Sequence, residues 1–232
     1  MNTKIFISIS MLTCIFVNNG CAQKRYLELS EFKPPLGEWF EAGAVKTDPD
    51  NGMLLVATDG DGVFINGEKG RTEHLVTREA HSDIQLEMEF MISQGSNSGV
   101  YLQGRYEIQI YDSWGREDLS AQDCGAIYYR WDEHTNVVFD GTPPPVNACK
   151  KPGEWQHLLI KFRAPRFDSE GEKINNAVFE EVVLNGITLH SNVEVTGPTR
   201  SSLDDIEEPT GPLMFQGTHG PVAFRNIRMI RL

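Results

Sequence analysis

The sequence predicts an antiparallel β-sandwich, and three observations support this fold class. Residues 84–92 alternate apolar and polar side chains with a period of two, as in a strand with one buried face. About a dozen such short segments are separated by Gly, Pro and Asn-Gly pairs. No stretch shows a long helical period. A β-barrel is the alternative arrangement of the same strands.

The expected strands follow one another at short intervals. They are residues 53–57, 63–65, 74–77, 84–92, 100–103, 106–111, 127–131, 155–162, 179–184, 187–190, 213–216 and 222–232. Asn66-Gly67 and Asn185-Gly186 predict tight hairpins, and Gly104 would join two further strands in the same way. A Gly-rich turn is expected at 59–62, and long irregular loops are expected at 132–153 and 191–212.

Composition limits the partners. The 232 residues include 21 Lys and Arg against 33 Asp and Glu, a formal net charge of -12. Such a surface repels phosphate backbones and anionic membranes, so nucleic acid is an unfavourable partner. A neutral polymer such as a glycan needs no charge complementarity and fits the composition. The length suits one domain with a substantial core, which we assign to residues 35–232.

The N-terminus predicts export. A basic start is followed by an apolar run over residues 5–17, which is typical of a signal peptide and too short to span a bilayer. We assign residues 1–22 to this signal. Gly20-Cys21 resembles the end of a lipoprotein signal, in which Cys21 would carry a lipid anchor, and ordinary cleavage near Cys21 is the alternative. Both place the protein in the periplasm or, as a lipoprotein, at the outer membrane.

Cys124 and Cys149 remain after the signal is removed. An exported compartment permits a disulfide between them, and two unpaired buried thiols are the alternative. Zinc is disfavoured, because no second Cys or His lies at ligand spacing from either cysteine.

One expected strand carries a polar face. Glu107, Gln109 and Tyr111 alternate with apolar residues, so they share a face with about 6.5 to 7 Å between neighbours. A carboxylate beside an amide and a phenol can bind several sugar hydroxyls, and the carboxylate could also act as a base or bind a metal. The alternative is an ordinary amphipathic strand that faces solvent.

Further candidates lie near this face. The loop that contains Asn97 opens a strand on which Tyr101, Gln103 and Arg105 would share a face, next to the face of Glu107 if the two strands form a hairpin. Asp112 and Trp114 follow the strand of Glu107, where a cleft position is expected. A solvated hairpin charge is the alternative for Arg105.

The C-terminal segment adds three candidates. Gln216 lies on the polar side of an expected strand, and His219 lies between turn residues, as at a cleft rim. His219 could serve as a base or metal ligand, and a structural role is the alternative. Arg225 is expected on an inward polar face, where an Arg usually pairs with a carboxylate.

Several known chemistries have no counterpart in the sequence. It contains no Gly-x-Ser-x-Gly elbow, no phosphate-binding glycine loop, no His-Glu-x-x-His and no dinucleotide fingerprint, so no organic cofactor is expected. The paired carboxylates of an ordinary glycosidase are not evident either.

A set of motifs in fixed order resembles the 3-keto-disaccharide hydrolase family, which is abundant in Bacteroidetes and Planctomycetes. The motifs are Asp83-Ile-Gln-Leu-Glu-Met-Glu-Phe, Asn97-Ser-Gly-Val-Tyr-Leu-Gln, Tyr106-Glu-Ile-Gln-Ile-Tyr-Asp, Cys124-Gly-Ala-Ile-Tyr, Lys151-Pro-Gly-Glu-Trp155, Leu184-Asn-Gly186, Gly211-Pro-Leu-Met-Phe-Gln-Gly-Thr-His-Gly220 and Phe224-Arg-Asn-Ile227. The resemblance covers about residues 35–232. Thr218 departs from the acidic or closely similar residue expected there.

The resemblance implies a concanavalin-like jelly roll that cleaves glycosides already oxidised at sugar C3. A ketone at C3 acidifies the C2 proton, so a base can drive loss of the C1 substituent, and water then adds back. By the resemblance, Glu107, Gln109 and His219 occupy the family's polar motif positions, with Glu107 or His219 as the base. A divalent cation bound by these two residues would serve as the electrophile. A glycan-binding module without catalysis and a conventional endo-glycosidase are the rival interpretations.

Overall fold

The structure is a computed structural model that describes residues 26–232. The predicted signal peptide and Cys21 lie outside this range. The elements are the 3₁₀ helix η1 (Leu29–Glu31) and the strands β1 (Phe40–Thr47), β2 (Leu55–Ile65), β3 (Leu75–His81), β4 (Ile84–Ile92), β5 (Asn97–Leu102), β6 (Tyr106–Tyr111), β7 (Arg130–Asp132), β8 (Val137–Phe139), β9 (Gln156–Arg163), β10 (Arg166–Phe167), β11 (Lys173–Asn175), β12 (Ala177–Leu184), β13 (Ile187–Val195), β14 (Gly211–Phe215) and β15 (Val222–Arg231). No helix within residues 26–232 is long and apolar enough to cross a bilayer.

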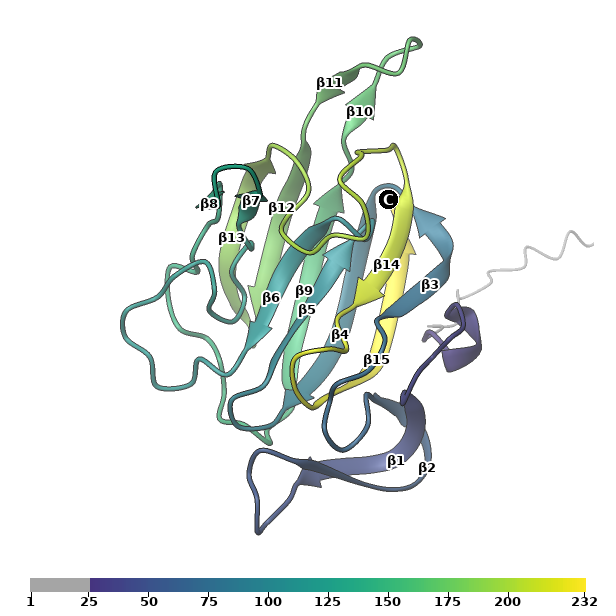
Figure 1. The fold of residues 1–232 in the computed structure, drawn as a ribbon, viewed down its shortest axis with the longest axis vertical. Helices are drawn as coiled ribbons and strands as arrows, with labels where there is room; N and C mark the ends of the chain where they lie inside the picture. The colour runs from purple at the N-terminus through teal and green to yellow at the C-terminus, as the bar shows by residue number, and fades with distance from the viewer. Residues whose placement is uncertain (1–25) are drawn as a thin grey trace, which may run out of the picture.

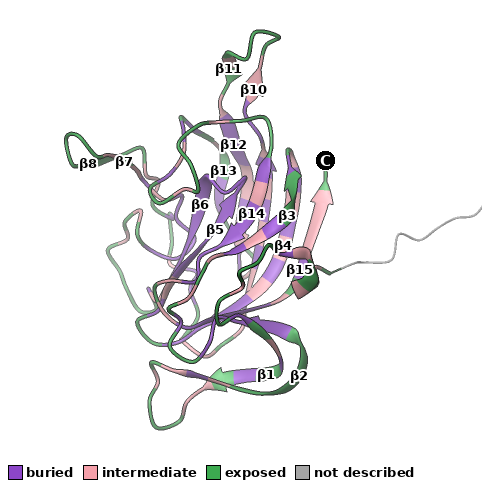
Figure 2. Cartoon of the chain, turned by 45° about the vertical axis from the view of Figure 1, so that its right-hand side comes forward, coloured by how far each residue is buried: buried purple, intermediate pink, exposed green. Residues whose placement is uncertain are grey.

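Two antiparallel sheets form the body of the molecule (Figure 1). The large sheet has the order β1-β2-β15-β4-β9-β12-β13, and the small sheet has the order β3-β14-β5-β6. This arrangement confirms the predicted all-β, single-domain sandwich of jelly-roll type. The two short hairpins β7-β8 and β10-β11 stand away from the body, and Figure 2 shows them and the connecting loops as largely exposed.

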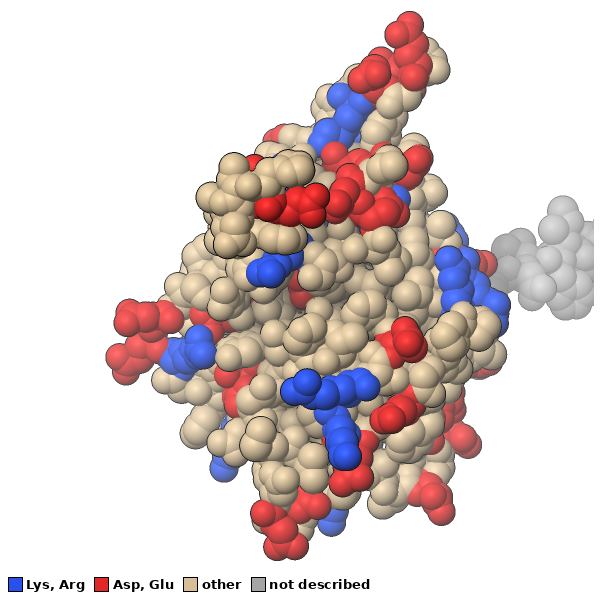
Figure 3. Space-filling view, in the orientation of Figure 1, with Lys and Arg blue, Asp and Glu red and all other residues tan. Residues whose placement is uncertain are grey.

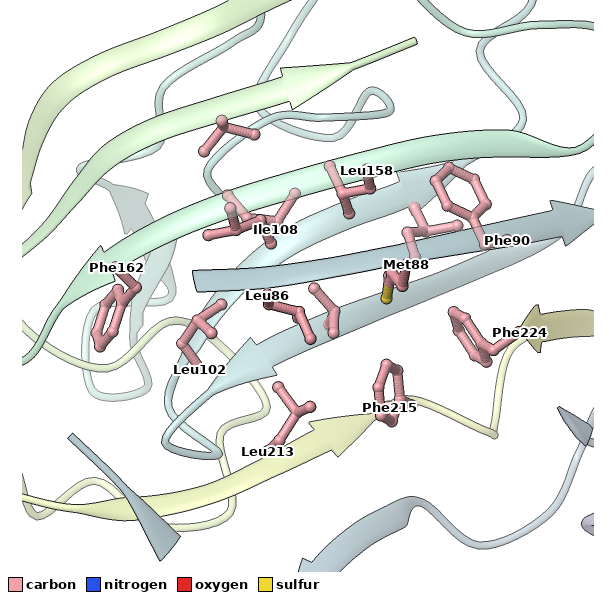
Figure 4. Close-up of a cluster of buried hydrophobic side chains, with 14 of the residues drawn as sticks. Leu86, Met88, Phe90, Leu102, Ile108, Leu158, Phe162, Leu213, Phe215 and Phe224 are labelled. Atoms are coloured by element: carbon pink, nitrogen blue, oxygen red, sulfur yellow. The ribbon is translucent and has the colours of Figure 1, made fainter. Parts of the chain in front are cut away.

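The core lies between the two sheets. The predicted alternation of β4 is confirmed, because Leu86, Met88 and Phe90 are fully buried while the residues between them are partly exposed. They meet side chains from the small sheet, among them Ile108 and Phe215, in one apolar layer (Figure 4). Each such buried side chain contributes about 1.5–3 kcal/mol to folding.

Two predicted hairpins are confirmed. Gln103 and Gly104 have the left-handed φ angles 55° and 67° in the three-residue turn that joins β5 to β6, where Leu102 pairs with Tyr106. Asn185 and Gly186 join β12 to β13, with φ angles of 53° and 83°. The first of these turns fixes the register of the polar face, because it places Tyr101 directly opposite Glu107.

Residues 53–67 differ from expectation. Residues 59–62, expected as a turn, lie within β2 as a bulge: they stand opposite a single residue of β1, because Ala42 pairs with Val63 and Ala44 with Thr58. Gly60 adopts a φ of 136° there and lies against Gly43, so the two backbones approach closely. Asn66 does not form a hairpin; its amide bonds the carbonyl oxygens of Gly217 and Gly220. Asn66 therefore makes long-range hydrogen bonds instead of a local turn. The strand β1 was not predicted from the sequence.

Candidate active site

The polar face predicted on β6 lies on the outer side of the small sheet. Val100 and Ile108 point into the core, so their neighbours Tyr101, Glu107 and Gln109 point the other way. These three are nevertheless only 1–2% exposed. The alternative prediction, that this face of β6 is exposed to solvent, is therefore wrong.

Two segments cover this face. Residues 125–129 run along the free edge of β6: Gln109 donates its backbone N–H to Ala126, and Tyr128 donates to Glu107. Residues 199–210 cross above, where the Thr199 hydroxyl accepts the Glu107 N–H at 3.1 Å. Because the polar side chains lie beneath these segments, they are shielded from bulk water.

Glu107 lies in the centre of this face. Its carboxyl group lies over Gly99 on β5, and a methyl group built on Gly99 would be 2.0 Å from Glu107 Oε1. Glu107 Oε2 is buried and has no hydrogen-bond partner. Burial raises the pKa of Glu107 to about 8, and a hydrogen bond from Tyr101 opposes part of this rise. At pH 7 the carboxyl group is therefore mostly protonated, with a small population of a strongly basic carboxylate.

Phenol groups surround this carboxyl group. The Tyr101 hydroxyl lies 3.3 Å from the backbone oxygen of Arg200 and beside the Glu107 carboxyl group, so its one proton can be donated to either acceptor, and the hydroxyls of Tyr128 and Tyr129 are 2.8 Å apart. Burial raises the pKa of Tyr101 and of Tyr128, and negative charge on Glu107 raises both further. The phenols therefore remain protonated at neutral pH and can donate hydrogen bonds to a developing negative charge.

Two buried amides border the same position. Gln109 accepts a hydrogen bond from the Ile110 N–H at 3.0 Å, and Gln216 Oε1 has no partner. The Gln216 backbone pairs with Gly99, so both amides flank the space that the missing side chain of Gly99 leaves above the sheet. Glu107 Oε2 and Gln216 Oε1 are buried acceptors without a protein partner, so both can accept a hydrogen bond from a polar ligand.

His219 does not join this group. It is exposed in the β14-β15 loop, with Nδ1 2.6 Å from the Thr218 hydroxyl. Its backbone pairs with Asn97, four residues along β5 from the rung that joins Tyr101 to Glu107. With two strand spacings added, the Cα atoms of His219 and Glu107 are roughly 16 Å apart. No hydrogen bond or ion pair joins their side chains in the described residues, and Asn97 lies beside His219.

The donors near Glu107 do not fit a metal held by protein side chains. Within residues 26–232, no three His, Cys, Asp or Glu side chains gather where they could hold one ion. The other groups around Glu107 are phenols and amides; an amide oxygen can bind Ca²⁺, but a single carboxylate supplies little of the negative charge with which proteins usually hold a divalent cation.

Arg105 and Arg225 differ from their predicted roles as substrate contacts. Arg105 is buried, and its guanidinium bonds both carboxylate oxygens of Asp204 and the backbone oxygen of Thr210. It therefore holds the segment 199–210 over the site. Arg225 lies on the outer face of the large sheet, paired with Glu89 and stacked 3.9 Å above the Trp155 ring. This face is on the opposite side of the sandwich from Glu107.

Cys124 and Cys149 are free, buried thiols, which is the second of the two predicted alternatives. Gln156 Nε2 lies 3.5 Å from Cys149 Sγ. A hydrogen bond from Cys124 is the main cause that lowers the pKa of Cys149 to about 7.

The surface on this side of the molecule is weakly charged in its middle. Figure 3, in the orientation of Figure 1, shows mainly uncharged residues over the central strands and groups of Asp, Glu, Lys and Arg around them. A neutral sugar is compatible with such a face.

Comparison with known proteins identifies the family. A sequence profile of the 3-keto-alpha-glucoside-1,2-lyase-like domain matches residues 28–230. The chain belongs to this family. A search of curated proteins found no match.

Solved structures similar to this lyase-like domain include two candidate glycosyl hydrolases from Parabacteroides distasonis. One is 26% identical with a TM-score of 0.57, and the alignment covers 84% of this chain and 79% of that chain. The other is 22% identical with a TM-score of 0.50, covering 84% of this chain and 99% of that chain, and it shows the fold alone. Together the family and the first structure indicate a glycoside hydrolase-like enzyme.

Several residues of the lyase-like site were not predicted from the sequence. Gly99, Tyr128, Tyr129, Thr199 and Arg200 all contact Glu107 or Tyr101, or lie next to them. Tyr128 could have been found, because it ends the motif that begins at Cys124. Nothing local indicates Thr199 or Arg200, which reach the site only through the fold.

Proposed function

We propose that this protein hydrolyses 3-keto-glycosides by elimination and hydration at C1 and C2 of the oxidised sugar, with Glu107 as the base. The observation that carries the proposal is the buried, partly unpartnered carboxyl group of Glu107, whose pKa burial raises to about 8. A carboxylate of this basicity is much better suited to remove a carbon-bound proton than an ordinary exposed one.

The elimination needs one proton transfer and one bond cleavage. The ionised Glu107 takes the proton from C2, which the C3 ketone makes acidic. The electron pair of the C2–H bond forms a C1–C2 double bond, and the C1–O bond to the aglycone breaks. The aglycone oxygen leaves as an alcohol after it takes a proton from solvent or from a phenol of the site.

The hydration reverses this sequence with water. Glu107, now protonated, returns a proton to C2 while the oxygen of water bonds to C1 and its second proton passes to solvent, or to the phenol that protonated the aglycone. The net result is hydrolysis, and Glu107 ends in its starting state. Negative charge that develops on the C3 oxygen would be stabilised by the protonated Tyr101 and Tyr128 hydroxyls, which supply the electrophilic assistance in this account.

Conventional glycoside hydrolysis fits the site less well. That reaction uses two carboxyl groups about 5–9.5 Å apart. Among residues 26–232, the pKa of Glu107 responds to burial and to Tyr101, and no second carboxylate contributes to it. A single carboxyl group of high pKa among phenols supports proton abstraction next to a ketone.

The test compares a 3-keto-glucoside with its parent glucoside and follows release of the aglycone by the purified protein. We expect release from the keto sugar alone, and Glu107→Gln should lower its kcat/KM by about 10²–10⁴-fold. Glu89→Gln is the matched control, because Glu89 lies on the outer face of the large sheet. Cleavage of the parent glucoside alone would contradict the proposal, and binding without turnover of either sugar would favour a lectin.

A further inference from the structure

A second polar hollow is lined by residues at or just beyond the ends of β1, β4 and β6, among them Thr47, Gln94 and Asp112. Its volume is about 390 Å³, and Gln94, Asp112, Trp114 and Lys151 are among its lining residues. Asp112 is five residues along the chain from Glu107, which corresponds to roughly 17 Å of extended strand. The hollow is therefore separate from the site around Glu107.

Trp114 lies in a turn whose backbone is fixed by hydrogen bonds. Trp114 is 56% exposed, although burial of so large an apolar side chain would stabilise the folded protein. The residue before it, Ser113, is fully buried, and Asn147 bonds the Ser113 and Arg116 carbonyl oxygens at 2.7 and 3.0 Å. The Ser113 hydroxyl also accepts the Cys124 N–H. A backbone held on both sides of an exposed indole lowers the entropy cost of ordering that indole around a ligand.

Polar groups of three kinds surround this indole. Asp112 uses Oδ2 to accept the Gly95 N–H at 2.8 Å, which fixes the carboxylate and leaves Oδ1 able to accept further bonds. The Lys151 ammonium lies 5.9 Å from the centre of the Trp114 ring, and the Gln94 amide lies against Gly52. A flat apolar ring bordered by a carboxylate, an amide and an ammonium matches a pyranose ring, whose C–H face stacks while its hydroxyls donate and accept.

We propose that this hollow is a second glycan-binding site, which takes one neutral pyranose unit of an oligosaccharide by stacking on Trp114. The net charge of -12 disfavours a polyanionic ligand. The choice of a sugar as ligand agrees with the proposed function, but binding here requires no turnover at Glu107. The site would hold a longer glycan on the protein while its oxidised end is processed elsewhere.

The experiment measures binding of cellohexaose, maltohexaose, xylohexaose and the anionic hexagalacturonate by titration calorimetry. The protein carries Glu107→Gln, so that no ligand is consumed. We expect at least one neutral hexasaccharide to bind, and Trp114→Ala in the same background to weaken its Kd at least about tenfold. Trp114→Phe keeps a flat ring and should retain most of the affinity. Trp131→Ala is the matched control, because Trp131 is another partly exposed indole, on β7.

The outcomes separate this site from the proposed active site. Equal affinity with and without the Glu107→Gln change, together with loss in Trp114→Ala alone, supports the second site even if no 3-keto-glycoside is turned over. The proposal is overturned if no neutral hexasaccharide binds, if only hexagalacturonate binds, or if Trp131→Ala weakens binding while Trp114→Ala leaves it unchanged. Equal melting temperatures of the variants would show that each comparison is between folded proteins.

Discussion

Replacement of Glu107 by Gln tests the protonation state of the proposed base without any substrate. Gln has the same shape as a protonated Glu and cannot ionise. In the unfolded chain the Glu107 carboxyl has an ordinary pKa of 4.5, and in the folded protein burial raises this pKa to about 8. Between these values the folded state holds a proton that the unfolded state has lost, so the free energy of unfolding falls as pH rises.

The magnitude follows from the two pKa values. From pH 5 to pH 7 this one group lowers the free energy of unfolding by about 2–3 kcal/mol, and the Gln variant lacks the effect. The stability of Glu107→Gln relative to wild type should therefore rise by about 2–3 kcal/mol between pH 5 and pH 7. For a domain of this size the corresponding gain in melting temperature is about 5–10 °C.

The assay is urea unfolding of both proteins from pH 5 to pH 8, followed by tryptophan fluorescence. Other groups that titrate in this range cancel in the difference between variant and wild type. Glu89→Gln is the control whose difference from wild type should stay constant from pH 5 to pH 8, because hydrogen bonding to Arg225 lowers the pKa of Glu89 and its contribution is lost only below this range. A constant difference between Glu107→Gln and wild type would refute the reasoning, since it would mean that Glu107 ionises at its ordinary pKa.

Four further predictions concern turnover and the cover of the site. With a 3-keto-glucoside, kcat/KM should rise with pH and level off above an apparent pKa of about 8, because Glu107 acts as a base only when ionised; a profile already flat at pH 5 would contradict this. Gly99→Ala should lower kcat/KM at least about tenfold, because the added methyl group would collide with Glu107 Oε1; unchanged kinetics would disprove the contact. Arg105→Met should lower the free energy of unfolding by about 1.5–3 kcal/mol and speed amide exchange in residues 199–210, since it removes the bonds to Asp204 and Thr210; wild-type exchange there would argue against it. Dialysis against EDTA should change kcat/KM by less than about twofold, because the donors around Glu107 do not fit a protein metal site; loss of turnover that Mg²⁺ or Ca²⁺ restores would refute this.

The fold was predictable from the sequence where the signal is local. The alternation of β4 and the turns at Gly104 and Gly186 specify strand faces and neighbouring pairs, and all three are confirmed. The hairpin predicted at Asn66-Gly67 is wrong, because the Asn side chain that favours a tight turn can also form a hydrogen bond with a distant backbone carbonyl group. The pairing of β2 with β15, more than 150 residues apart, has no local signal.

The candidate site was predictable only in part. Alternation placed Glu107 and Gln109 on one face, but their burial depends on residues 125–129 and 199–210, which pack there only in the folded chain. Arg225 shares a motif with the family but lies on the other sheet, since strand order decides which sheet a segment joins. His219 lies on a different rung from Glu107, because register depends on the β14-β15 loop.

The fate of the C2 hydrogen tests the central claim most directly. A 3-keto-glucoside that carries deuterium at C2 is hydrolysed in ordinary water, and the 3-keto-glucose formed is analysed by mass spectrometry, with a sample of labelled product as the control for spontaneous exchange. Elimination breaks the C2–D bond before the aglycone leaves, so the account predicts slower aglycone release from the labelled than from the unlabelled substrate, and loss of deuterium to the extent that Glu107 exchanges with water before it returns a proton. Equal rates with and without the label, together with full retention of deuterium in the product, would mean direct displacement at C1 and would contradict the account.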